Sequence, residues 1–162
     1  MKAAALQMVS TPRVDENLAQ AQALIAQAAA QGAELVALPE YFCLMGHRDA
    51  DKLAIAEPLA DAEAPDAQTC PMQAMLAQAA KQHGVWLIGG TLPILSHEAQ
   101  RVFNTTLVFN PQGSRVARYD KIHLFCFDDG DKAYNEAHTL TPGAQPVAFD
   151  MTDQSGQSWR IG

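Results

Sequence analysis

Three charged residues, far apart in the sequence, are of types that could take part in proton transfer and charge stabilisation. Glu40 ends the apolar run in ALPEYF, Lys121 lies in RYDKIHL, and Glu136 lies in YNEAHTLTPG. A carboxylate can move a proton, and a lysine that leaves water needs a carboxylate or a substrate beside it. Each residue also has an ordinary structural interpretation, which its surroundings in the sequence must decide.

Glu40 follows a stretch that is typical of a buried strand. Residues 33–40 are apolar up to Pro39, a residue that sheets tolerate only at strand ends and edges. In open α/β sheets, functional groups gather at the carboxyl ends of strands. A carboxylate there is expected to be partly desolvated and suited to proton transfer. The alternative is an acidic residue that caps the next turn, and this motif alone favours neither interpretation.

Lys121 and Glu136 carry weaker signals when each is taken alone. In a strand with alternating side chains, Tyr119, Lys121 and His123 would share one face. On an edge strand, a lysine lies in solvent and discourages aggregation. The residues therefore favour a solvent-exposed lysine at position 121 and a plain surface charge at position 136.

The cysteines and histidines indicate neither a nucleophile nor a metal site. Cys43, Cys70 and Cys126 form no CxxC pair and have no metal-ligand spacing. An inert thiol is favoured for each, and a weaker alternative makes Cys43 or Cys126 a nucleophile. The five histidines have no ligand spacing between them, so no metal and no other cofactor is expected.

The elements that must position these residues alternate at first between strands and helices. A short helix is expected around 48–56, and residues 126–143 are expected to be irregular. The other expected elements are strands at 3–9, 33–40, 85–95, 102–113 and 114–124, helices at 14–32 and 71–84, and a hairpin of 145–151 with 157–162. This order predicts a layered α/β architecture with helices on a mixed sheet.

Length and composition indicate one globular domain. The chain has 162 residues, of which 48% are hydrophobic and 18% charged, with a formal net charge of −7. Basic residues form no run, so nucleic acid is not an expected partner. No apolar stretch reaches the roughly 18 residues of a membrane span. An odd number of cysteines without a secretion signal favours reduced thiols in the cytoplasm.

Together, these motifs resemble a known family. LPEYF, YDKIHLF and NEAHTLTPG occur in the order and register of the nitrilase superfamily, the carbon–nitrogen hydrolases, and GVWLIGGTLP and NTTLVFNPQG are similar to it as well. The resemblance covers residues 1–162 and is greatest to the bacterial amidases related to deaminated-glutathione amidase and ω-amidase. It implies an α/β fold, the four-layer αββα sandwich, with this chain as the N-terminal part of a single domain.

The resemblance also implies a Glu–Lys–Cys triad. Glu40 would be the general base, Lys121 would stabilise the oxyanion, and Glu136 would be a second carboxylate that orients the lysine or assists proton transfer. The family's nucleophilic cysteine follows the strand that begins RIG, and this sequence ends at Gly162 before such a cysteine. We therefore expect an amidase fragment, incomplete at its C-terminus and inactive by itself, whose exposed core faces favour aggregation or pairing with other chains.

Two functions are consistent with these expectations. The first is a cytoplasmic, homodimeric amidase that hydrolyses the amide of a small ω-amido acid, such as deaminated glutathione, through a thioester on the absent cysteine. Arg48 is a candidate to bind the anionic end of such a substrate. The second is a truncated, non-catalytic homologue that binds a ligand or partner subunits. The sequence leaves open the exact amide and the choice among amidase, carbamoylase and nitrilase chemistry.

Overall fold

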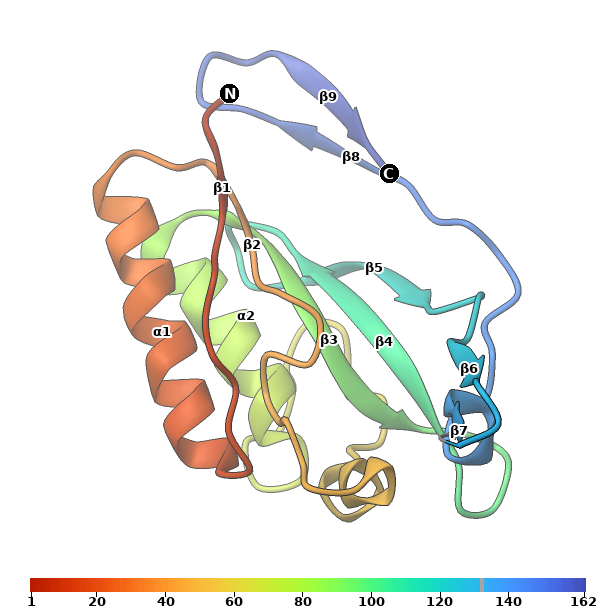
Figure 1. Ribbon diagram of the computed structural model, residues 1–162. Helices are drawn as coiled ribbons and strands as arrows, with labels where there is room; N and C mark the ends of the chain where they lie inside the picture. Colours follow the sequence, from red (N-terminus) through yellow and green to blue (C-terminus); the bar gives the residue numbers. More distant parts are fainter. Residues whose placement is uncertain (132) are drawn as a thin grey trace.

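A five-stranded mixed sheet is the centre of the molecule (Figure 1). The computed structural model describes residues 1–131 and 133–162. In sheet order, the strands are β1 (Ala3–Ala5), β2 (Leu35–Ala37), β3 (Trp86–Leu95), β4 (Val102–Phe109) and β5 (Arg115–Asp120). The first three strands pair in parallel and the last three pair antiparallel, so the mixed sheet predicted from the sequence is confirmed.

The two long helices lie together against one face of this sheet (Figure 1). α1 (Val14–Ala30) connects β1 to β2, and α2 (Pro71–His83), together with the short 3-10 helix η1 (Asp49–Ile55), lies between β2 and β3. Parallel neighbours need such crossovers because a short turn cannot return the chain to the start of the next strand. No described helix is both long and apolar enough to pass through a bilayer.

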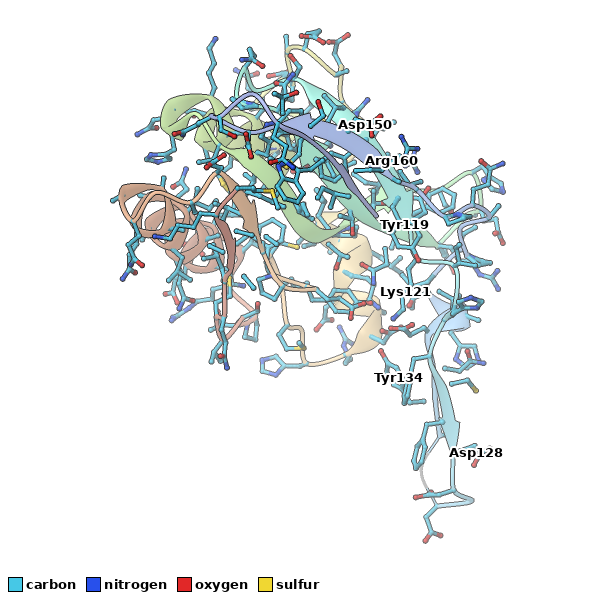
Figure 2. All side chains as sticks on the ribbon, turned by 90° about the horizontal axis from the view of Figure 1, so that it is seen from above. Tyr119, Lys121, Asp128, Tyr134, Asp150 and Arg160 are labelled. Carbon is cyan, nitrogen blue, oxygen red and sulfur yellow. The ribbon has the colours of Figure 1, made fainter. Side chains whose placement is uncertain are left out.

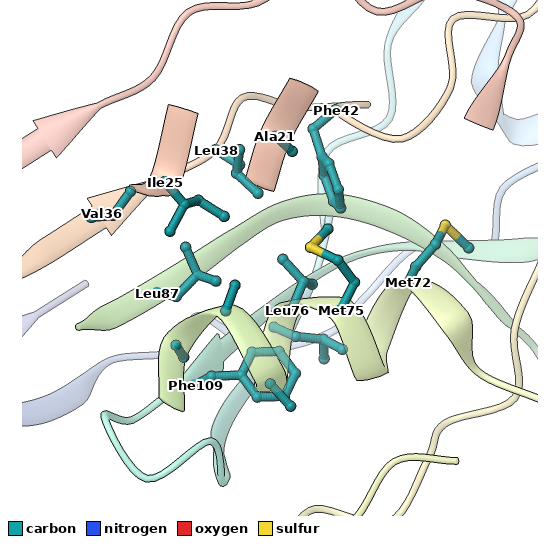
Figure 3. Close-up of a cluster of buried hydrophobic side chains, with 14 of the residues drawn as sticks. Ala21, Ile25, Val36, Leu38, Phe42, Met72, Met75, Leu76, Leu87 and Phe109 are labelled. Carbon is teal, nitrogen blue, oxygen red and sulfur yellow. The ribbon is translucent and has the colours of Figure 1, made fainter. Parts of the chain in front are cut away.

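The core lies between these helices and the sheet. Figure 3 shows Ile25 of α1 and Leu76 of α2 facing Leu87 of β3, all fully buried. Alanines such as Ala21 and Ala80 are buried beside them, and small side chains allow helices to pack closely. The alanine-rich faces of the two helices are therefore the faces that pack against the sheet.

A hairpin lies against the opposite face of the sheet. It consists of β8 (Phe149–Thr152) and β9 (Ser158–Ile161), as the sequence predicts. The ring of Trp86 in β3 stacks on that of Phe149, with 6.0 Å between their centroids, and its indole nitrogen donates to the Thr152 carbonyl at 3.3 Å. A cavity of about 160 Å³ between the hairpin and the sheet is lined by Ile88, Val108 and Ile161, among others. The sheet is thus covered by helices on one face and partly by strands on the other.

Residues 126–143 are more ordered than their polarity suggests. The sequence predicts an irregular segment, but the structure has a second hairpin, β6 (Cys126–Asp128) with β7 (Ala133–Asn135), followed by the 3-10 helix η2 (Glu136–His138). Phe125 and Tyr134 pack against each other with 5.8 Å between their ring centroids. These strands are only three residues long, which is too short for an alternating pattern to be recognised.

Strand lengths also differ from the prediction. β1 and β2 cover three residues each, because their pairing ends where the chain turns toward the loops that follow. β5 covers Arg115–Asp120 and not 114–124. Lys121 therefore lies just after the strand, and the prediction that it shares a strand face with Tyr119 and His123 is wrong. The strand ends matter here because Glu40 and Lys121 both follow one.

Gly90 lets the loop after β2 lie directly on β3. Its φ of +33° occurs where the pairing of β3 with β4 shifts register. A Cβ at this position would lie 2.2 Å from the carbonyl oxygen of Pro39, the residue before Glu40. The next residue, Thr91, accepts a hydrogen bond from the Tyr41 amide through its Oγ1 at 2.8 Å. These two contacts place Glu40 over the sheet.

Gly90→Ala should therefore destabilise the protein more than an ordinary glycine substitution. The new methyl group would meet a backbone oxygen, and we expect a loss of about 3 kcal/mol in the free energy of unfolding. Gly84→Ala is the matched control, since Gly84 also has a positive φ, of +62°, but no atom lies near its added Cβ. The control should lose about 1 kcal/mol through backbone strain alone. Urea denaturation measures both, and equal losses would contradict the close contact at Pro39.

Candidate active site

The three charged residues singled out in the sequence meet at one place. The Nζ of Lys121 lies 3.2 Å from Oε1 of Glu40, and 3.1 Å and 2.9 Å from the two carboxylate oxygens of Glu136. Glu40 and Lys121 are 81 positions apart in the sequence. The lysine is therefore held between two carboxylates that come from different parts of the chain.

Glu40 reaches this position from the loop that follows β2. Its neighbour Tyr41 has a φ of +52°, which turns the chain sharply after the carboxylate. Oε1 of Glu40 also accepts a hydrogen bond from Nδ2 of Asn104 at 2.8 Å. The side chain of Glu40 is 49% exposed, so about half of its surface remains in contact with solvent.

Lys121 is anchored through its backbone on both sides. Its amide donates to the Asn104 carbonyl at 2.9 Å, and its carbonyl accepts from the Gly143 amide at 2.9 Å. A Cβ on Gly143 would lie 2.1 Å from the carbonyl oxygen of Asp120, so the segment with Gly143 can approach only as glycine. The side chain is 24% exposed, and the expectation of a solvated edge-strand lysine is wrong because two carboxylates pair with it.

Glu136 is the most buried of the three residues. Its residue exposure is 4%, which corrects the interpretation as a plain surface charge. Oε2 accepts from the Phe125 amide at 2.7 Å, and the Glu136 amide donates back to the Phe125 carbonyl at 3.0 Å. Burying a carboxylate costs free energy unless it is paired and hydrogen-bonded, and here Lys121 and Phe125 supply both interactions.

The two carboxylates keep the lysine charged. Burial by itself would lower the pKa of Lys121, because it disfavours the ammonium form. The hydrogen bonds and charges of Glu136 and Glu40 outweigh that effect and raise the pKa above its ordinary value. The site therefore holds a fixed positive charge at neutral pH, which can stabilise an anion that forms beside it.

A polar cluster that the sequence did not reveal borders this site. The carboxylate of Asp49 in η1 accepts hydrogen bonds from Lys52, from the Tyr134 hydroxyl at 2.9 Å and from the Thr139 hydroxyl. Figure 2 shows Lys121 near the base of the β6–β7 hairpin, which projects from the body of the molecule with Asp128 toward its far end. Tyr134 and Thr139 lie on either side of Glu136, so η1 holds the segment that carries it.

Two tyrosines beside the carboxylates remain protonated. Burial and the charges of Glu136 and Glu40 raise the pKa of Tyr41. Burial and the hydrogen bond to Asp49 raise that of Tyr134. Both phenols line a cavity of about 220 Å³ next to the site, together with the positively charged Arg48. This cavity could hold part of a small molecule whose reacting group lies at Lys121.

The three cysteines of this chain lie in different environments. Cys43 is fully buried, and burial raises the pKa of its thiol to about 12, which disfavours the alternative that makes it a nucleophile. Cys70 is buried and donates to the Pro58 carbonyl at 3.4 Å, whereas Cys126 is exposed on β6. Within residues 1–131 and 133–162, none of the three hydrogen-bonds to Glu40 or Lys121, and no cluster of possible metal ligands occurs.

Asn104 is the other site residue that sequence reasoning missed. It lies inside β4 and has a residue exposure of only 2%. A polar residue at a buried strand position was the available signal, since such residues are retained only where they find a partner. The partner could not be identified, because Glu40 is 64 positions away in the sequence.

Comparisons with known proteins show the family of this chain. The family model described as carbon–nitrogen hydrolase matches residues 2–162. The deaminated glutathione amidase of Synechocystis sp. is 38% identical over 156 residues, which are 95% of this chain and 54% of that protein. Omega-amidase NIT2-A of Xenopus laevis is 34% identical over 92% of this chain and 50% of its own length. The chain spans about half the length of the curated relatives it matches.

Solved structures show the same fold. Saccharomyces cerevisiae Nit3, a member of branch 10 of the nitrilase superfamily, superposes with a TM-score of 0.70 at 26% identity, over 89% of this chain and 48% of that one. The Caenorhabditis elegans NitFhit protein also gives 0.70, at 24% identity, over 88% and 33%. The α/β fold with helices on one face of a mixed sheet is that of the nitrilase superfamily. On the match over residues 2–162, this chain belongs to the carbon–nitrogen hydrolase family.

Proposed function

We propose that this chain carries the base and the oxyanion-stabilising lysine of an amidase that acts on a small ω-amido acid, such as deaminated glutathione. The observation that carries the proposal is Lys121 held between Glu40 and Glu136. Amide hydrolysis by a thiol needs a base and a group that stabilises the oxyanion, and a carboxylate beside a charged lysine can supply both. The names of the relatives from Synechocystis and Xenopus support the substrate class.

In the first half of the reaction, Glu40 takes the proton from a cysteine thiol supplied by a part of the protein outside these residues. The thiolate attacks the amide carbon, and the oxygen that becomes negative is stabilised by the Lys121 ammonium group. The carbon–nitrogen bond then breaks, the proton on Glu40 passes to the leaving nitrogen, and ammonia departs. A thioester remains on the cysteine.

In the second half, water replaces ammonia. Glu40 removes a proton from the water, whose oxygen attacks the thioester, and Lys121 again stabilises the negative oxygen. The carbon–sulfur bond breaks, Glu40 returns the proton to the sulfur, and the carboxylic acid leaves. Glu136 does not exchange protons in this scheme: it keeps Lys121 charged and in place through its contact at 2.9 Å.

The cavity beside the site suits the remainder of such a substrate. We propose that Arg48, whose side chain is 84% exposed, binds the anionic end, since it lines this cavity and its pairing with Asp51 is open to solvent. The same proposal includes a cytoplasmic homodimer, with residues 1–162 as the N-terminal part of one domain. The runner-up is a non-catalytic homologue that binds a ligand or subunits, which the lack of a thiol at Glu40 favours.

Intact mass and ammonia release from the protein purified from its source cell test the proposal. We expect a mass well above 17.5 kDa and hydrolysis of small ω-amido acids. Glu40→Gln and Lys121→Met should each lower kcat by about 10²-fold or more. Glu16→Gln, at an exposed acid on α1, is the control and should keep the wild-type rate. A mass of 17.5 kDa without ammonia release would contradict the amidase and favour the non-catalytic homologue.

The charge on Lys121 should depend on Glu136. Because that carboxylate raises the pKa of the lysine, Glu136→Gln should lower it, and the Nζ nitrogen shift followed by NMR against pH measures the change. Glu98→Gln, which removes an acid that pairs with Arg101, is the control and should leave the titration of Lys121 unchanged.

The same contact has a consequence for stability. A raised pKa in the folded state stabilises the protein below the unfolded pKa of about 10.4, and this contribution is lost as the pH rises through the folded value. The alkaline loss of stability should therefore be smaller in Lys121→Met. An identical pH dependence in both proteins would show that the lysine gains nothing from its partners.

A further inference from the structure

Asn104 contacts both the proposed base and the lysine. Its side-chain Nδ2 donates to Oε1 of Glu40 at 2.8 Å, and its backbone carbonyl accepts from the Lys121 amide at 2.9 Å. The Nζ of Lys121 contacts the same Oε1 at 3.2 Å, so Asn104, Glu40 and Lys121 all contact one another. One residue therefore determines where the two charged groups lie relative to each other.

Asn104 is more firmly held than either residue that it contacts. It is buried in β4, which pairs with β3 on one side and with β5 on the other. Glu40 lies in a loop, and Lys121 follows the end of β5. A group on an inner strand can serve as a fixed reference for groups on loops, because packing and hydrogen bonds on both sides restrict its movement.

The contacts also make the two oxygens of Glu40 different. Oε1 accepts from both Asn104 and Lys121. Within the residues that the structure describes, Oε2 of Glu40 accepts no hydrogen bond, and the side chain is half exposed. Oε2 therefore keeps its lone pairs available, while Oε1 is occupied by donors that fix the orientation of the carboxylate.

The side-chain oxygen of Asn104 indicates why this residue is buried. Among the described residues, its Oδ1 is the buried side-chain oxygen or nitrogen that has no hydrogen-bond partner. A buried polar atom without a partner lowers the free energy of unfolding, so a contribution to stability does not explain Asn104. Exchanging Nδ2 and Oδ1 would place an oxygen against the carboxylate of Glu40 and repel it. The side-chain amide of Asn104 is thus oriented by its contact with Glu40, and this orientation leaves Oδ1 without a partner.

We propose that Asn104 is a positioning residue of the amidase reaction, which holds Oε1 of Glu40 so that Oε2 is the oxygen that exchanges protons with the thiol and with water. This inference rests on the proposed function. It predicts an unusual separation of effects, in which removal of the amide lowers the rate without lowering stability.

Asn104→Leu is the main variant, because leucine has a similar size and carries neither the donor nor the unpartnered oxygen. In the native protein, we expect kcat to fall by about 10²-fold, the effect of a misplaced catalytic group, with KM within about threefold of wild type. The urea midpoint should stay the same or rise. Thr105→Val, also on β4, is the matched control: it removes a part-buried hydrogen bond from Thr105 to Asp120 of β5 and should lower the midpoint but not kcat.

NMR tests the contact without relying on catalysis. In the native protein, the side-chain amide protons of Asn104 should exchange slowly with solvent, and Glu40→Ala should shift their resonances strongly. Unshifted Asn104 resonances in Glu40→Ala would overturn the inference. A wild-type kcat in Asn104→Leu would also overturn it. So would a urea midpoint of Asn104→Leu that falls enough for unfolding to explain the lost activity. A wild-type protein that releases no ammonia would overturn the proposed function itself, and the positioning role with it.

Discussion

The pairing of Lys121 with Glu40 and Glu136 is the interaction on which the rest of the site depends. Glu40 follows β2 and Lys121 follows β5, so β3 and β4 lie between the two strand ends in the sheet. The charges can meet only because the loop after β2 crosses β3 at Gly90 and reaches Asn104 on β4. The site therefore depends on the backbone as much as on the side chains. A methyl group at position 90 would separate the Glu40 carboxylate from its partners.

Burial distinguishes the two carboxylates that pair with Lys121. At their formal charges, two carboxylates and one ammonium group carry one net negative charge. The buried Glu136 is paired with Lys121 and hydrogen-bonded to the Phe125 amide. Glu40 is half exposed and has one oxygen without a donor in the described structure. This difference in burial suits the different roles that we propose for these two carboxylates.

The layers of the fold relate this site to the family. The helices cover one face of the sheet, and the hairpin β8–β9 begins to cover the other through Trp86 and Phe149. The chain spans about half of its curated relatives, and among the described residues none of its three cysteines hydrogen-bonds to Glu40. The proposed base, the lysine and the second carboxylate thus all come from this half, whereas we propose that the thiol comes from elsewhere.

By itself, the sequence determined the types of most elements, because the spacing of apolar residues shows which face of a helix or strand is buried. α1, α2 and β3 lie where this spacing predicts, and the motifs around Glu40, Lys121 and Glu136 were recognisable through their resemblance to a family. The hairpin β6–β7 was not predictable, since strands of three residues have no readable period. Only the tertiary structure decided that Glu136 is buried, that Asp49 holds the segment around it, and that Asn104 contacts both Glu40 and Lys121. These contacts join residues up to 90 positions apart, and local patterns specify which side chains leave water but not which distant partner each one meets.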